Sequence, residues 1–174
     1  MPTLKSEKGA IRAYPEKKAK SPEQALASLM RLSSRAEKSS GDARRLMRVW
    51  GIEKAEAEKI LARLAEQKFI DDARYAAAYT REKTRLSGWG VHKIHAALAA
   101  KGIARDTVAA ATADLDGDKM RETLERQLTR RMPRIKAASQ YELRTKLTRY
   151  GLSLGYDYED VAEAVEKALK NRDA

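Results

Sequence analysis

The sequence contains no cysteine, which excludes a disulfide framework and a zinc site built from thiolates. Its apolar runs are shorter than the roughly 18 residues that a transmembrane helix requires, and its charged N-terminus lacks the apolar stretch of a signal peptide. From these absences we expect a cytoplasmic protein that does not contact a membrane. Only 6% of the residues are aromatic and 35% are charged, so the pattern favours amphipathic helices with aliphatic cores.

Residues suited to catalysis are also scarce. His92 and His95 are the only histidines, and no third ligand accompanies them, so a polar helix surface explains their spacing better than a metal site. The segment 88–90 lacks the rest of a dinucleotide fingerprint, and no phosphate-binding loop is present. Asp71 and Asp72 are adjacent, so they diverge at a helix start and favour capping over acid–base chemistry. We therefore expect a protein that is not an enzyme, with no cofactor and no metal.

The charge balance is strongly basic. The chain has 36 basic and 25 acidic residues, a net charge of +11. Such an excess favours a polyanionic partner, nucleic acid first among them, although a basic protein without such a partner remains the alternative. Residues 1–20 carry a net charge of +4 with little apolar periodicity, which is typical of a flexible basic arm that either contacts phosphates or serves solubility.

The basic residues gather in the last third of the chain. Between Lys119 and Arg149 there are ten basic and three acidic residues, and an acidic run follows from Asp157 to Glu166. This separation of signs suits one face for phosphates and another for a basic protein surface, against the alternative of an ordinary solvated charge distribution. The candidate binding residues in this region are Arg126, Arg130, Arg131, Arg134, Arg144, Lys146 and Arg149.

Apolar periodicity and end signals predict nine helices. Ser21 and Ser139 are each followed three residues later by Gln or Glu, the pattern of a capping box. Gly, Ser and Pro residues mark the ends of the other expected helices. The expected helices span 22–38, 42–50, 54–67, 72–86, 91–101, 105–115, 118–132 and 140–151, with a last helix from about 157.

An internal repeat organises these helices. Gly51, Gly102 and Gly151 lie 51 and 49 residues apart, and similar apolar positions precede and follow each of them. The third unit fits only if four residues are inserted within 153–156. We expect each glycine to form the tight turn between the second and third helices of its unit. The predicted fold is therefore all-α, with three tandem three-helix, helix-turn-helix-like repeats in an elongated modular body.

The expected domain limits follow from this repeat. They are a basic arm at 1–20 and three-helix repeats at 21–70, 71–116 and 117–174. Trp50 and Trp89 stand at unit boundaries, where packing between helices explains them better than base stacking. The glycine turns also allow a helix-turn-helix DNA-binding protein as an alternative function, although no clear set of base-reading side chains accompanies them.

Three stretches resemble the bacterial RecX family. They are Ala25, Leu26, Leu29, Arg31 and Leu32; the segment Phe-Ile-Asp-Asp-Ala-Arg-Tyr-Ala at 69–76; and the unit 91–103, which ends in Lys-Gly-Ile. The resemblance covers roughly residues 22–170 and implies three tandem three-helix repeats. It also implies a regulatory protein that binds the recombinase RecA and its filament on single-stranded DNA along the groove. Members modulate, and usually inhibit, strand exchange and the linked ATPase and coprotease activities in DNA repair and recombination, and several bind DNA directly.

The segment 69–76 is expected to form the boundary between the first two repeats. Asp71 or Asp72 starts the helix there, and Tyr75 packs across the boundary. Arg74, one turn inside that helix, is a further candidate for contact with RecA or nucleic acid, and its alternative role is an ion pair with a nearby aspartate. We expect the protein to be a monomer.

Overall fold

The structure, a computed structural model, describes residues 19–172. All regular elements within this range are helical, which confirms the predicted all-α fold. Most of the expected basic arm, residues 1–18, lies outside the described residues.

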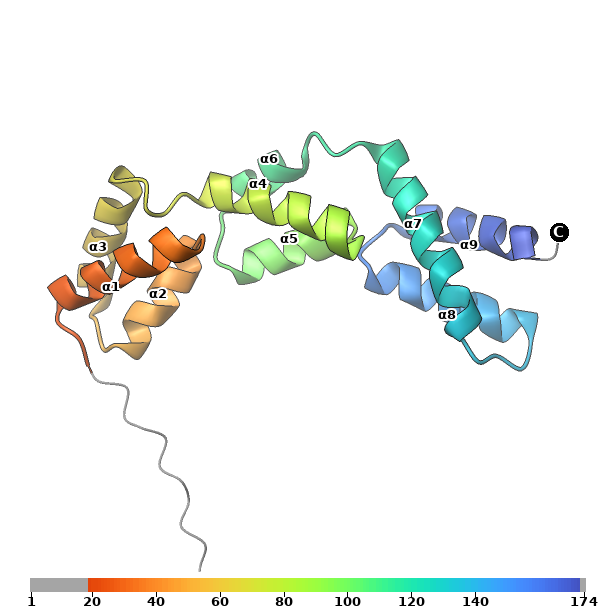
Figure 1. The fold of residues 1–174 in the computed structure, drawn as a ribbon, viewed down its shortest axis with the longest axis horizontal. Coiled ribbons are helices and arrows are strands. Elements are labelled where there is room, and N and C mark those ends of the chain that lie inside the picture. The colour runs from red at the N-terminus through yellow and green to blue at the C-terminus, as the bar shows by residue number, and fades with distance from the viewer. Residues whose placement is uncertain (1–18, 173–174) are drawn as a thin grey trace, which may run out of the picture.

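The helices form three groups of three in a row (Figure 1). We call α1–α3 repeat 1, α4–α6 repeat 2 and α7–α9 repeat 3. Repeat 1 lies at one end, repeat 3 at the other, and repeat 2 connects them. The elements are α1 (Pro22–Arg35), α2 (Ser40–Val49), α3 (Lys54–Glu66), α4 (Asp72–Glu82), the π-helical turn η1 (Lys83–Ser87), α5 (Val91–Ala100), α6 (Arg105–Thr112), α7 (Gly117–Arg131), the 3₁₀ turn η2 (Met132–Arg134), α8 (Gln140–Ser153) and α9 (Tyr158–Arg172).

Each repeat has its own aliphatic core. Leu29, Met47 and Leu64 are fully buried in repeat 1, and Ile94 and Leu98 in repeat 2. Repeat 3 has the largest cluster, with Leu124, Leu128, Leu147, Val161 and Val165 at its centre. Units with small separate cores touch only their neighbours, and the body is therefore elongated. The limits 21–70, 71–116 and 117–174 stay our proposal for the repeat boundaries.

The third turn glycine is Gly155, and the prediction of Gly151 was wrong. Helix α8 continues through Gly151, and Gly155 has a φ of +90°, like the +77° of Gly51 and +75° of Gly102. Counted from Gly155, the buried residues Val161, Ala164 and Ala168 fall six, nine and thirteen positions later, as in the other repeats. The four extra residues are therefore one additional turn of helix α8.

Gly151 has a different use within helix α8. A Cβ on Gly151 would lie 2.7 Å from Val161 Cγ1. The missing side chain thus allows α8 and α9 to approach each other closely.

Three expected helices end earlier than their patterns indicate. Helix α1 ends at Arg35 because Ala36 is extended, with a φ of −158°. Helix α4 ends at Glu82, where the hydroxyl of Thr84 donates to the carbonyl of Thr80 at 2.8 Å and η1 begins. Helix α6 ends at Thr112, whose hydroxyl donates to the carbonyl of Val108 at 3.2 Å. Hydroxyl groups at helix ends compete in this way with the backbone N–H groups.

The two expected capping boxes differ. Ser21 has the complete arrangement, since its hydroxyl accepts from Gln24 N and the Gln24 side chain accepts from Ser21 N. Ser139 accepts from Glu142 N at 3.1 Å, but the Glu142 carboxylate accepts from Ala138 N instead. Both serines still begin their helices as expected.

Candidate binding surfaces

Repeat 1 meets repeat 2 where helix α2 begins and helix α5 ends, a contact that we call the first joint. The Ser39 hydroxyl donates to the Lys101 carbonyl at 2.9 Å. Gly41 lies so close to Lys101 and Gly102 that a Cβ on Gly41 would collide with the Lys101 carbonyl oxygen. A glycine is therefore required at this contact.

Charged groups surround this contact. Asp72 at the start of α4 accepts from the Ser40 backbone N at 2.8 Å and from its hydroxyl at 2.6 Å. Asp42, whose side chain is only 11% exposed, pairs with Lys101 at 3.2 Å and with Arg45 at 2.9 Å. Burial acts to lower the pKa of Lys101, but the hydrogen bond and charge of Asp42 raise it overall, so Lys101 stays positive.

The segment 69–76 lies at the first joint, next to these charges. Asp71 begins helix α4, since its carboxylate accepts from Arg74 N at 3.0 Å, and this bond lowers the pKa of Asp71. The Arg74 side chain pairs with Glu37, in the link between α1 and α2, at 2.7 Å. The expected alternative partner was an aspartate, and the residue that fills this place is a glutamate from repeat 1. Tyr75 packs against the core of repeat 2 and stacks on Tyr79, with ring centroids 6.0 Å apart.

Repeat 2 meets repeat 3 in a similar way at the second joint. Gly90 N donates to the Leu154 carbonyl at 2.8 Å, and His92 N donates to the Gly155 carbonyl at 3.1 Å. Trp89 packs against the cores of both repeats, which supports the expected packing role. The Trp89 ring also meets Tyr79 edge-on, at 6.4 Å between centroids.

The carbonyl before each turn glycine accepts a hydrogen bond in all three repeats. The donor to Lys101 O is Ser39, and the donor to Leu154 O is Gly90, each the residue that caps the second helix of the preceding repeat. In repeat 1 the donor to Trp50 O is Lys20 N, at 3.1 Å. The Lys20 ammonium also lies 3.7 Å from the centre of the Trp50 ring. Lys20 therefore donates at repeat 1 where Ser39 and Gly90 donate at repeats 2 and 3.

The two histidines point to different partners. His92 Nε2 lies 2.7 Å from Asp157 Oδ1, and His95 Nε2 lies 2.7 Å from the Thr112 hydroxyl. Within residues 19–172 no group of three or more His, Asp or Glu side chains is arranged to hold a metal ion.

Part of the predicted basic cluster gathers where α7 crosses α8. Arg130 donates to Gln127 Oε1 at 2.9 Å, and the Tyr150 hydroxyl donates to the same oxygen at 3.4 Å. The Arg131 guanidinium lies 5.3 Å from the centre of the Tyr150 ring. Arg126 stands one turn before Arg130 on α7, where it donates to the Thr123 hydroxyl at 3.1 Å.

Two members of the predicted set are paired with carboxylates. Arg144 on α8 forms an ion pair with Glu166 on α9, and Lys146 pairs with Glu142 at 2.6 Å. The separation of charge along the chain is therefore not fully kept in space, because α8 and α9 pack side by side. Among the ion pairs of residues 19–172, none involves the exposed members that we call the repeat-3 arginines: Arg126, Arg130, Arg131, Arg134 and Arg149.

Arg74 lies apart from the repeat-3 arginines. It belongs to the start of α4, beside repeat 1, whereas α7 lies beyond the other end of repeat 2 (Figure 1). The structure thus divides the predicted site residues between two places. Their roles in binding stay predictions.

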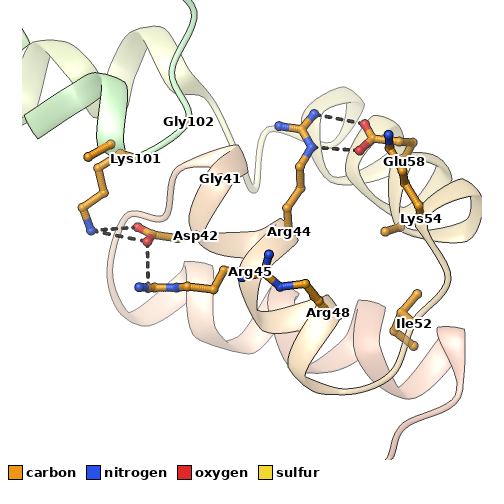
Figure 2. Close-up of a pocket in the computed structure, with 12 residues that line it drawn as sticks. Gly41, Asp42, Arg44, Arg45, Arg48, Ile52, Lys54, Glu58, Lys101 and Gly102 are labelled. Atoms are coloured by element: carbon orange, nitrogen blue, oxygen red, sulfur yellow. Dashed lines mark hydrogen bonds and ion pairs between the residues drawn. The ribbon is translucent and has the colours of Figure 1, made fainter. Parts of the chain in front are cut away.

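A second basic region lies at the first joint. A groove of about 630 Å³ runs between α2, the start of α3 and the end of α5, and we call it the first-joint groove. Figure 2 shows Arg45 and Lys101 directed at Asp42, and Arg44 directed at Glu58. The basic residues that line the groove are Arg44, Arg45, Arg48, Lys54 and Lys101. No sequence pattern brings them together, because they come from three segments, 41–48, 52–58 and 100–102.

None of the helices in the described part of the chain is both long enough and apolar enough to cross a bilayer.

Comparison with known proteins identifies relatives that are regulatory proteins RecX. A family model described as "RecX, second three-helix domain" matches residues 71–111. The regulatory protein RecX of Cronobacter sakazakii is 34% identical over 107 residues, which cover 60% of this chain and 61% of the relative. The regulatory protein RecX of Xanthomonas campestris is 37% identical over 84 residues, which cover 48% of this chain and 51% of the relative. The chain thus spans at most about three-fifths of these curated relatives.

Solved structures share the fold. The crystal structure of RecX from Lactobacillus salivarius superimposes with a TM-score of 0.73 at 18% identity, over 84% of this chain and 96% of that chain. A second crystal structure of a regulatory protein RecX gives a TM-score of 0.77 at 20% identity, over 84% and 73% of the two chains. At these identities the similarity shows the three-repeat architecture alone.

Proposed function

The chain belongs to the family of RecX regulatory proteins, and we propose that it binds RecA and the RecA filament on single-stranded DNA and inhibits the recombinase. The observation that carries this proposal is the family match in sequence together with the row of three repeats. RecA itself enters through the resemblance to the family. The protein acts in this proposal by binding, without turnover of its own.

The row of repeats suits a helical filament. A filament presents the same surface at regular intervals, so similar units in a row can contact successive protomers along its groove. Each added contact then forms at a high effective concentration, which raises the overall affinity without any single strong site. In this proposal repeats 1 and 2 span adjacent RecA protomers.

The repeat-3 arginines are the proposed contact to DNA phosphates or to acidic RecA side chains. They are exposed and lack carboxylate partners among residues 19–172, so they are free to pair with an anion. Contacts of arginine with phosphates release counterions and weaken as salt is added. Arg144 and Lys146 first have to leave Glu166 and Glu142, so we propose a smaller contribution from these two.

The test is a titration of the protein into RecA filaments on single-stranded DNA while ATP hydrolysis and filament length are followed. We expect both to fall as the protein is added. The variant Arg130→Glu/Arg131→Glu/Arg134→Glu should inhibit less and show a weaker salt dependence. A matched control reverses three exposed cations elsewhere, Arg63, Arg105 and Lys170. No effect of the wild-type protein on either readout contradicts the proposal.

The competing function is that of a helix-turn-helix protein that acts directly on duplex DNA. Competition between duplex DNA and the RecA filament for binding to the protein distinguishes the two functions. The helix-turn-helix function requires a preference for particular duplex sequences over unrelated DNA. In our proposal unrelated duplexes compete equally well and weakly for the repeat-3 arginines, and the RecA filament competes best.

A further inference from the structure

The first-joint groove belongs to two repeats at once. Its walls come from α2 and the start of α3 in repeat 1, and from Ala100, Lys101 and Gly102 at the end of α5 in repeat 2. A molecule in the groove therefore touches both sides of the first joint. Gly41 and Gly102, which both line the groove, lie close together, one from each repeat (Figure 2).

The charges of the groove are unbalanced. Five cations line it against two carboxylates, Asp42 and Glu58. Asp42 is shared by Lys101 and Arg45, and Glu58 is held by Arg44 through two hydrogen bonds of 2.8 and 3.0 Å. Arg48 and Lys54 form no ion pair with the described residues. The groove thus keeps a net charge of +3, which attracts an anion.

The uncharged part of the groove is aliphatic. Ile52, Ala57 and Ala100 line it, and no aromatic ring does. Single-stranded nucleic acids gain much of their affinity from stacking of bases on aromatic rings. A peptide gains from an aliphatic floor, since a leucine-like side chain can be buried there while charged neighbours reach the rim. The lining therefore favours an acidic peptide over a nucleic acid.

We propose that the first-joint groove binds a short acidic segment of a partner protein. An apolar side chain of that segment lies against Ile52, Ala57 and Ala100, and its carboxylates pair with Arg48, Lys54 and the exposed side of Arg45. The binding itself follows from the groove, and only the assignment of the segment to a protein of the recombination filament rests on the proposed function. Because the segment contacts both repeats, its binding also fixes their relative orientation.

The end of α5 offers a matched pair of test positions. Ala99 and Ala100 are both exposed, but only Ala100 lines the groove. Ala100→Glu places a negative charge and extra volume in the groove without removing any native bond. Ala99→Glu makes the same change of charge next to the same helix end but outside the groove. Ala100→Lys adds similar volume with the opposite charge.

The experiment measures binding of a fluorescein-labelled twelve-residue peptide of alternating Asp and Leu by fluorescence anisotropy with the full chain. We expect Ala100→Glu to weaken binding about tenfold or more through repulsion of like charges. Ala99→Glu should stay within about twofold, as expected for a charge outside the interface. Ala100→Lys should bind more tightly than Ala100→Glu, and Arg48→Glu should resemble Ala100→Glu. Urea midpoints of the two glutamate variants that equal the wild-type midpoint establish that folding is unaffected.

Two further probes test the chemistry of the ligand. A peptide with Ser in place of Leu keeps the charge and loses the apolar side chains, so it should bind more weakly. Oligothymidylate should not compete with the Asp–Leu peptide. The inference is overturned if the peptide does not bind, if Ala99→Glu and Ala100→Glu weaken it equally, or if oligothymidylate displaces it while the Ser peptide binds as well.

The outcomes for the groove and for the proposed function are distinguishable. Peptide binding is measured without RecA, whereas the filament titration tests inhibition with variants of the repeat-3 arginines. If the peptide binds with the expected order of affinities among the variants but the protein has no effect on RecA, the result supports peptide binding in the groove and contradicts the proposed function. Inhibition of RecA without peptide binding does the reverse.

Discussion

The two joints of the row use equivalent contacts in different surroundings, donated by a side-chain hydroxyl (Ser39) in the first joint and by a backbone N–H (Gly90) in the second. In both, the cap of a second helix donates to the carbonyl before the next turn glycine, at 2.9 Å in the first joint and 2.8 Å in the second. The first joint is surrounded by charges, namely Asp42, Lys101, Asp72 and the pair of Arg74 with Glu37. The second joint shares Trp89 between the cores of two repeats.

This difference indicates where the row bends. The exposed pair of Arg74 with Glu37 is weak and is screened by salt. A shared aromatic side chain such as Trp89 resists separation of the repeats, because separation exposes its apolar surface. We therefore expect repeats 2 and 3 to move as one body and repeat 1 to pivot at the first joint. The first-joint groove lies at this pivot, so a ligand there controls the orientation of repeat 1.

Substitution of the turn glycines should give the largest losses in the free energy of unfolding, and the loss should differ from one glycine to the next. Gly155→Ala combines positive φ with a Cβ only 2.9 Å from Lys93 Cα, and Gly102→Ala places its Cβ 3.0 Å from Gly41 Cα. Gly51 has positive φ but open space around it. We expect losses of roughly 4 kcal/mol for Gly155→Ala and roughly 1 kcal/mol for Gly51→Ala, with Gly102→Ala between them. Urea unfolding measures the free energy that each variant loses. Equal losses for Gly155→Ala and Gly51→Ala would show that the close contacts at the joints do not contribute to stability.

Trp89→Ala should separate repeat 3 from repeat 2. The loss of a shared aromatic side chain costs about 3 kcal/mol and removes the apolar link between the two cores. We expect unfolding to lose its single cooperative transition, with a lower denaturant slope. Trp50→Ala is the control, because Trp50 packs against the core of repeat 1 alone. The comparison fails if both variants unfold in one transition of unchanged slope.

Asp72→Ala should loosen the first joint at a smaller cost. Ser40 loses the carboxylate that accepts from its N–H and its hydroxyl, for which we expect about 1–2 kcal/mol. Because the chain has no cysteine, spin labels at Ala27→Cys and Ala109→Cys report the distance between repeats 1 and 2. That distance distribution should broaden in Asp72→Ala, and it should not in Asp71→Ala, whose carboxylate caps α4 without crossing the joint.

Asp71→Ala should give the smallest loss, and one that depends on pH. Removal of this cap costs about 1 kcal/mol at neutral pH. The backbone N–H of Arg74 lowers the pKa of Asp71 in the folded state. The stabilisation is therefore present above the unfolded pKa of about 4 and is lost as the pH falls through the lower folded value. Urea midpoints of the wild type and the variant should approach each other as the pH falls below the unfolded pKa of Asp71, and a difference that stays constant with falling pH would contradict the role of the charge.

The helices and the repeat could be predicted from the sequence because they depend on local patterns. Apolar spacing, caps and two of the three turn glycines determine the elements, and the observed helix ends mostly lie within a few residues of the expected ones. The misassigned glycine shows the limit of pattern matching. Tyr150-Gly151-Leu152 resembles the other two turns in sequence, but only Leu154-Gly155-Tyr156 gives the same apolar spacing after the glycine, because the four extra residues lie within α8.

The binding surfaces were harder to predict from the sequence, because they depend on how the helices pack. The ion pair of Arg144 with Glu166 joins two helices, and it removes a cation from the set that counting along the chain suggests. The first-joint groove unites α2 with residues at the end of α5, whose arrangement follows from the close approach of Gly41 and Gly102. Such contacts are set by the register between repeats, which short motifs do not encode.

The most direct test of the central claim is co-sedimentation of the protein with preformed RecA filaments on single-stranded DNA. The account predicts that the wild-type protein enters the pellet with the filaments and stays in the supernatant without them. The variant Arg130→Glu/Arg131→Glu/Arg134→Glu should enter the pellet less than the control Arg63→Glu/Arg105→Glu/Lys170→Glu. A wild-type protein that stays in the supernatant in the presence of filaments would contradict the account.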